Sequence, residues 1–106
     1  MALDLSSSTP NSTGWAMDRP TINQVVTVVT LPTWVRSVTL QPITNSLRVA
    51  PSGTDGAALG SDYITITGNT SRALSVAGQG RRAAPKLYLS ASADGTVVEL
   101  LLSDLV

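Results

Sequence analysis

The clearest alternation of polar and apolar residues lies near the C-terminus. Within residues 86–91, leucine and alanine alternate with polar or charged neighbours, which is typical of a half-buried β-strand. The Ala-Asp-Gly sequence at 93–95 is a turn signal, because Asp-Gly pairs tolerate positive φ. Residues 97–102 are apolar on both faces of a strand except at Glu99. We therefore predict a β-hairpin over residues 86–102 whose second strand is covered on both faces.

Further short segments rich in β-branched residues precede this stretch, separated by Pro32, Pro42 and glycine-bearing loops. No helical period persists for three turns. Short strands at close spacing predict an all-β fold, an antiparallel β-sandwich or a jelly-roll-like domain. The additional strands are expected at residues 21–30, 34–40, 46–49, 63–67 and 72–77.

The first 20 residues differ from the rest, since serine, threonine, proline and asparagine dominate them. Such a segment buries too little apolar surface to fold alone. We predict an extended N-terminal arm over 1–20, docked on its own domain or on a neighbour, and a sandwich body over 21–106. Trp15 is the expected anchor of the arm. The candidate partner contacts in the arm are Leu3, Leu5, Trp15 and Met17.

Composition narrows the classes of function. The chain of 106 residues is one domain by length, and its core must be aliphatic because it has no phenylalanine. Charged residues are 13% and the formal net charge is +0. A neutral surface suits packing against protein and argues against a nucleic-acid partner, which would require a basic stripe.

The absence of cysteine and histidine removes thiolate nucleophiles, imidazole bases and the usual zinc sites. Asp55, Asp62 and Asp94 lie in glycine-bearing loops, where oxygen ligands for calcium can occur, but their spacing fits no calcium-loop motif. Turn geometry explains such aspartates better. We therefore expect a non-enzymatic protein without cofactor or metal.

Neither a signal-peptide pattern nor an apolar run long enough for a membrane span is apparent. We therefore expect a soluble protein made in a cytoplasm, without a membrane partner.

Two groups of charges are candidates for specific contacts. Glu99 lies in an apolar strand, so it must face solvent or pair with a cation, and Arg36 is the first candidate partner, with Arg48 and Arg72 as alternatives. The only concentrated positive charge is Arg81 and Arg82, with Lys86 nearby. These two arginines either contact an acidic patch on a partner or form a solvated loop tip.

The few aromatic residues suggest a different class of function. If exposed, tryptophan and tyrosine could stack on sugar rings. We expect Trp34 to be a core residue, because it begins a predicted strand, and Trp15 to be an interface anchor. The residues of the alternative sugar-stacking platform are Trp15, Trp34, Tyr63 and Tyr88.

In their general sequence character, residues 25–102 resemble the small structural proteins of tailed bacteriophages. Among these, the resemblance is strongest to the capsid decoration or cement proteins. The resemblance rests on three stretches, at 34–42, 60–66 and 87–101. It implies a sandwich or jelly-roll body, clustering as a homo-oligomer that is often a trimer, and an arm that lies across the major capsid protein. It brings no catalytic residues to this chain.

The sequence therefore favours a virion protein that binds the outer capsid surface and stabilises the shell. One alternative is another part of the virion, such as a tail, collar or head-fibre base. The other is a carbohydrate-binding β-sandwich module.

Overall fold

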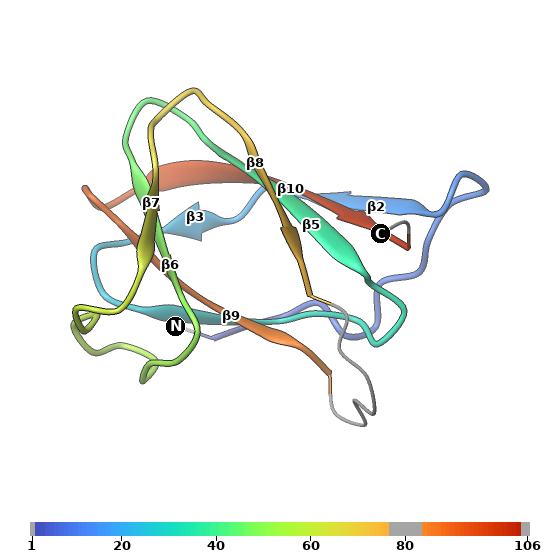
Figure 1. Ribbon diagram of the computed structural model, residues 1–106, viewed down its shortest axis with the longest axis horizontal. Helices are drawn as coiled ribbons and strands as arrows, with labels where there is room; N and C mark the ends of the chain where they lie inside the picture. The colour runs from blue at the N-terminus through green and yellow to red at the C-terminus, as the bar shows by residue number, and fades with distance from the viewer. Residues whose placement is uncertain (1, 77–83, 105–106) are drawn as a thin grey trace.

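The computed structural model describes residues 2–76 and 84–104, which form β-strands and no helix. The strands make two sheets packed face to face (Figure 1). Sheet 1 has the order β1-β4-β9-β6-β7, with β1 (Leu3–Asp4), β4 (Thr27–Thr30), β9 (Lys86–Ala91), β6 (Leu47–Ala50) and β7 (Ile64–Ile66). Sheet 2 has the order β2-β10-β5-β8, with β2 (Trp15–Asp18), β10 (Thr96–Ser103), β5 (Ser37–Pro42) and β8 (Arg72–Ser75). The short strand β3 (Thr21–Ile22) also pairs with β10.

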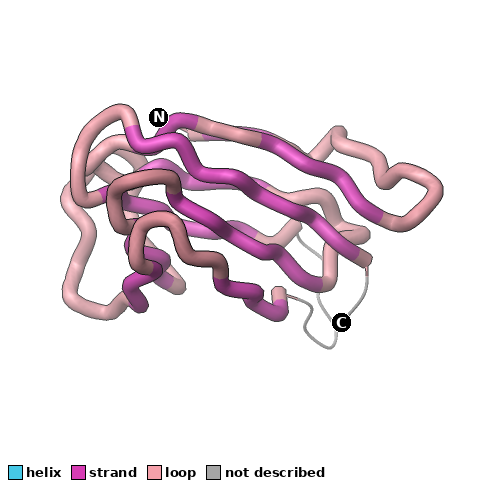
Figure 2. Tube along the Cα trace, turned by 90° about the horizontal axis from the view of Figure 1, so that it is seen from above, coloured by secondary structure: helices cyan, strands magenta, loops and turns pink. Residues whose placement is uncertain are grey.

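These two layers confirm the predicted all-β sandwich class. Among the described pairings, β1 runs parallel to β4 and the others are antiparallel. Seen from above, the strands run along the long axis of the molecule and loops close its ends (Figure 2). The fold has the two-layer form in which each sheet hides one apolar face against the other.

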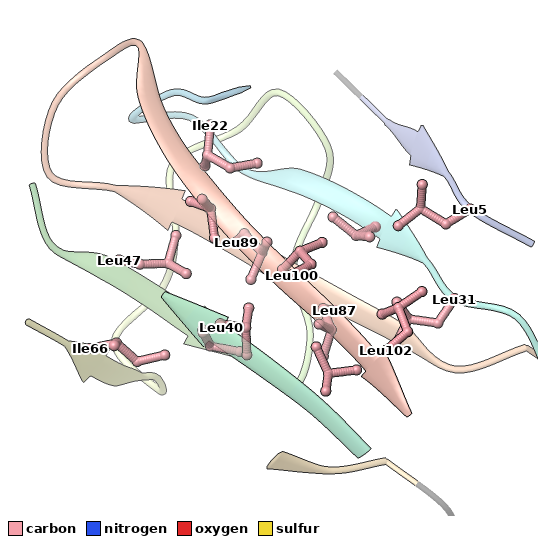
Figure 3. Packing of buried hydrophobic residues seen from close by; sticks show 14 of the residues in the cluster. Leu5, Ile22, Leu31, Leu40, Leu47, Ile66, Leu87, Leu89, Leu100 and Leu102 are labelled. Atoms are coloured by element: carbon pink, nitrogen blue, oxygen red, sulfur yellow. The ribbon is translucent and has the colours of Figure 1, made fainter. Parts of the chain in front are cut away.

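The core lies between the sheets and is aliphatic, as the composition requires (Figure 3). Alternation supplies it: every second residue of β5 and β10 is buried and the residues between are half-buried, except that Ser103 at the end of β10 is also buried. The largest fully buried aliphatic side chains are Ile22, Leu31, Leu40, Leu47, Leu89, Leu100 and Leu102.

The predicted hairpin over 86–102 is wrong, because β9 and β10 belong to different sheets. Strand β9 lies between β4 and β6, whereas β10 lies between β2 and β5. The 93–95 turn therefore carries the chain across the core. Both strands point their buried leucines into the interior from opposite sides (Figure 3).

The segment between β3 and β4 holds this crossing turn in place. The Gln24 N–H donates to Asp94 Oδ1 at 2.8 Å, and the Gly95 N–H donates to Asn23 Oδ1 at 3.0 Å. Ser90 Oγ donates to the Gln24 carbonyl at 2.6 Å. Because Asn23 and Gln24 are used in this way, the strand predicted over 21–30 is split into β3 and β4.

The first 20 residues lie on their own domain, which is one of the two docking places expected for them. Strand β1 extends sheet 1 beside β4, and β2 extends sheet 2 beside β10. Leu5 is 9% exposed and belongs to the core, so the expectation that it contacts a partner is wrong. The Trp34 indole N–H donates to the Ser8 carbonyl at 2.9 Å and fixes the chain between β1 and β2.

Gly68, in the turn between β7 and β8, lies against the link between β5 and β6. A side-chain carbon at this position would meet the carbonyl oxygen of Thr44 and lie 2.8 Å from that of Asn45. Thr44 has a φ of 74° and its N–H donates to Asn69 Oδ1 at 3.0 Å, so the opposing backbone is itself fixed.

We therefore expect Gly68→Ala to lower the free energy of unfolding by about 1–3 kcal/mol, measured by urea denaturation. Gly60→Ala is the matched control, because a side-chain carbon at Gly60 meets nothing within 4 Å. The control should change stability by less than about 0.5 kcal/mol. Equal effects of the two substitutions would contradict this account of the turn.

Candidate functional site

The outer faces of the two sheets differ in how they are covered. On sheet 1, the loop after β6 folds over the strands: Gly53 lies against Tyr88 and Val26. The Val26 N–H donates to the Ala57 carbonyl at 2.8 Å, and Val26 is fully buried. The Val28 N–H donates to Asp55 Oδ1 at 3.2 Å. This loop therefore shields part of the outer face of sheet 1.

Sheet 2 carries no such loop among the described residues, and its outer face includes two of the large exposed hydrophobic side chains. We call this surface the open face. Its residues form three rows across the strands, in the order β2, β10, β5, β8. The rows are Trp15, Ser103, Ser37 and Ser75; Met17, Leu101, Thr39 and Ala73; and Arg19, Glu99 and Gln41, the last beginning just beyond the end of β2.

The large apolar side chains of the open face lie on β2 and β10, and a shallow hollow lies beside them. Met17 is 76% exposed and Trp15 is 43% exposed, whereas Leu101 is half-buried. Next to Met17 the surface forms a shallow hollow of about 240 Å³. Its lining residues are Met17, Thr39, Gln41, Ser71, Glu99, Leu100 and Leu101.

The predicted partner of Glu99 is wrong: its carboxylate pairs with Arg19 at 3.2 Å rather than with Arg36. The antiparallel register explains the difference, since Glu99 lies opposite Gln41 while the Arg36 N–H donates to the carbonyl of Ser103, at the far end of β10. Arg36 precedes β5 and is exposed. Because Arg19 and Glu99 neutralise each other, the open face has no net charge from this pair.

The structure therefore brings together two of the four predicted arm contacts, Trp15 and Met17, on the open face. Leu3 is half-buried on β1, at the edge of sheet 1. Arg81 and Arg82 lie outside the described residues. Sequence reasoning missed Arg19, because assigning residues 1–20 to a separate arm excluded them as partners for the C-terminal strand.

The four aromatic residues do not form one platform. Trp15 lies on sheet 2, whereas Tyr88 lies on β9 in sheet 1. Tyr63 stacks with the Arg48 guanidinium, which is 5.2 Å from the ring centre. Trp34 is half-buried and packs against the core, as predicted. This separation does not favour the stacking of a sugar across several rings.

The aspartates in the glycine-bearing loops bind main-chain groups. Asp94 and Asp55 accept hydrogen bonds from the Gln24 and Val28 N–H groups, respectively, as turn geometry predicts. Asp4 accepts from Ser6, and these side-chain and backbone hydrogen bonds lower the pKa of Asp4 below its ordinary value. Within the described residues, no three His, Cys, Asp or Glu side chains gather closely enough to hold a metal ion.

Residues 2–76 and 84–104 contain no helix that could cross a membrane. The fold and the open face define the class of the protein as a small β-sandwich with one uncovered sheet. Comparison with protein-family models, with curated proteins and with solved structures finds no match to this chain.

Proposed function

We propose that the chain is a non-enzymatic structural protein of a tailed-phage virion, which binds the outer surface of the capsid and stabilises the shell. The observation that supports the proposal is the open face. Two large apolar side chains, Trp15 and Met17, are exposed there, on a face where Arg19 and Glu99 form an ion pair. Tryptophan exposed on such a surface is typical of a protein interface.

The side chains of the open face are suited to binding a protein partner rather than a nucleic acid. Beyond the ion pair of Arg19 with Glu99, its three rows contain tryptophan, methionine, leucine, alanine, serine, threonine and glutamine. Nucleic-acid binding requires cations that replace the counterions of phosphate groups, and these rows offer one arginine that is already paired. Neutral polar and apolar groups are typical of protein interfaces.

The proposed mechanism is linkage between binding and assembly. A protein that binds the assembled shell but not its free subunits shifts the equilibrium toward the shell, and many weak contacts repeated by symmetry add to the effect. An extended arm takes no part in this scheme, because β1 and β2 belong to the sandwich. We assign the contacts between this chain and the capsid to the open face instead.

The proposal is tested by sedimenting labelled protein with intact virions and with empty heads of the phage whose genome encodes the chain. We expect saturable binding to heads. Trp15→Ala should weaken this binding by about tenfold or more, because tryptophan truncation at an interface centre typically costs over 1 kcal/mol. Tyr63→Ala is the control, because Tyr63 is 37% exposed and precedes β7 of sheet 1, away from the open face.

Three outcomes would overturn the capsid assignment. Binding confined to isolated tails would support another position in the virion. Release of the bound protein by free sugars would support the carbohydrate-binding alternative. Absence of binding to any part of the particle would remove the virion proposal altogether. Thermal melting of both variants checks that each one is folded.

A further inference from the structure

We propose that Met17 is an oxidation site on the open face. Hydroperoxides convert its thioether to a sulfoxide, which makes the face more polar and weakens its docking. The docking step rests on the proposed function, which the inference extends by naming a modification that regulates the same surface. The chemical step depends on the position and exposure of Met17 alone.

The side chain of Met17 points into solvent. It is 76% exposed, which is the largest exposed fraction among the large hydrophobic side chains of the described residues. Alternation along β2 explains this, because its neighbour Ala16 packs against the core and the next residue must then face outward. Before docking, the thioether is therefore within reach of small oxidants.

The composition of the chain favours reaction at this position. Peroxides oxidise the sulfur of cysteine and methionine, and the chain has no cysteine to compete. Of its two methionines, Met1 lies outside the described residues. Within 2–76 and 84–104, Met17 therefore carries the one sulfur atom that a peroxide can attack.

The reaction transfers one oxygen atom. A lone pair of the sulfur attacks the hydroxyl oxygen of the hydroperoxide, the O–O bond breaks and an S–O bond forms. The proton of that hydroxyl group passes to the leaving oxygen, so the peroxide is reduced to water or an alcohol while the sulfur is oxidised by two electrons. Methionine sulfoxide reductases reverse the modification.

Oxidation should leave the fold intact. Met17 belongs neither to the hydrophobic core nor to the residues packed against it. The hollow of about 240 Å³ beside it gives the added oxygen room. Strand β2 pairs with β10 through main-chain hydrogen bonds, in which the side chain takes no part. The melting temperature of the oxidised protein should therefore equal that of the untreated protein.

The effect of oxidation falls on binding instead. A sulfoxide is a polar hydrogen-bond acceptor in place of an apolar sulfur, and docking removes water from it. The affinity for heads should fall by about tenfold or more, as is typical when a polar group is buried without a hydrogen-bond partner.

Treatment of the folded chain with hydrogen peroxide tests the chemical step. Tandem mass spectrometry, which distinguishes Met17 from Met1, should find one added oxygen atom at Met17. Met17→Leu is the matched variant, because leucine has a similar volume and no sulfur. An unmodified Met17 at peroxide concentrations that oxidise free methionine would overturn the inference, and so would unfolding on its oxidation.

Two further measurements test the consequence, with each protein compared with its own untreated sample. Oxidation should shorten the retention of the wild-type chain on a phenyl column and weaken its sedimentation with heads. Methionine sulfoxide reductase should restore both. Neither measurement should respond to peroxide in Met17→Leu to the same extent. An equal loss in that variant would overturn the inference.

The column separates failure of the inference from failure of the proposed function. If untreated protein binds no heads but oxidation still shortens its retention, the proposed function is rejected and the oxidation site on the open face stands. If oxidised and untreated protein bind heads equally, the inference is rejected and the proposed function stands.

Discussion

Deletion of residues 1–20 is expected to abolish cooperative folding of the domain. The deletion removes β1 from sheet 1 and β2 from sheet 2, so β4 and β10 each lose a neighbour. It also removes Leu5, and burial of a leucine contributes about 1.5–3 kcal/mol. Added to the lost hydrogen bonds, at about 0.5–1.5 kcal/mol each, the total approaches the 5–15 kcal/mol that stabilises a typical domain.

Circular dichroism during thermal melting measures this effect. The full chain should melt in one sigmoidal transition, and the truncated chain should lack one. A chain that begins at Leu3 is the control, because it keeps β1, β2 and Leu5. A truncated protein with an unchanged melting temperature would show that the N-terminal segment is a dispensable arm. Point substitutions such as Trp15→Ala are therefore better probes of partner binding than truncation.

Leu100→Ala is expected to lower the free energy of unfolding by about 2–5 kcal/mol, since a buried leucine replaced by alanine leaves a cavity. Leu100 is 1% exposed in the middle of β10, paired with Leu40 on one side and Asp18 on the other. Its side chain points into the centre of the core (Figure 3). The surrounding side chains relax only partly into such a gap, so part of the cavity remains.

The next residue along the strand provides the matched control. Leu101→Ala removes the same atoms from the outer face of the same strand, where the side chain is half-buried. Because solvent can replace the lost contacts, its cost should be under about 1 kcal/mol in urea denaturation of the monomer. Similar costs for the two substitutions would mean that β10 is covered equally on both sides.

The sequence predicted the class of fold because alternation is a local property. The inward-facing leucines of β9 were recognisable from period two alone, whereas the apolar run of β10 did not show which of its faces is buried. The link between these strands was not recognisable either, since an Asp-Gly turn can connect neighbours in one sheet or carry the chain across the core. That choice depends on Asn23 and Gln24, which are about 70 residues away in the chain and hold the turn.

The candidate site was only partly predictable for the same reason. Trp15 and Met17 attracted attention as large apolar residues in a polar segment. Their shared face with small residues of β5, two strands away, follows from two strand registers that cannot be read from the sequence. The pairing of Glu99 with Arg19 required the N-terminal segment to lie along β10, and a composition typical of disorder concealed this.

The path of the chain between the layers has a consequence for its biosynthesis. From β4 onward, consecutive strands change sheet at every link except that between β6 and β7. Strand β10 lies inside sheet 2, so β2, made early, has no partner until residues 96–103 have left the ribosome. Sheet 2 therefore cannot be completed before β10 has been synthesised, and the growing polypeptide keeps β2 without its partner strand until then.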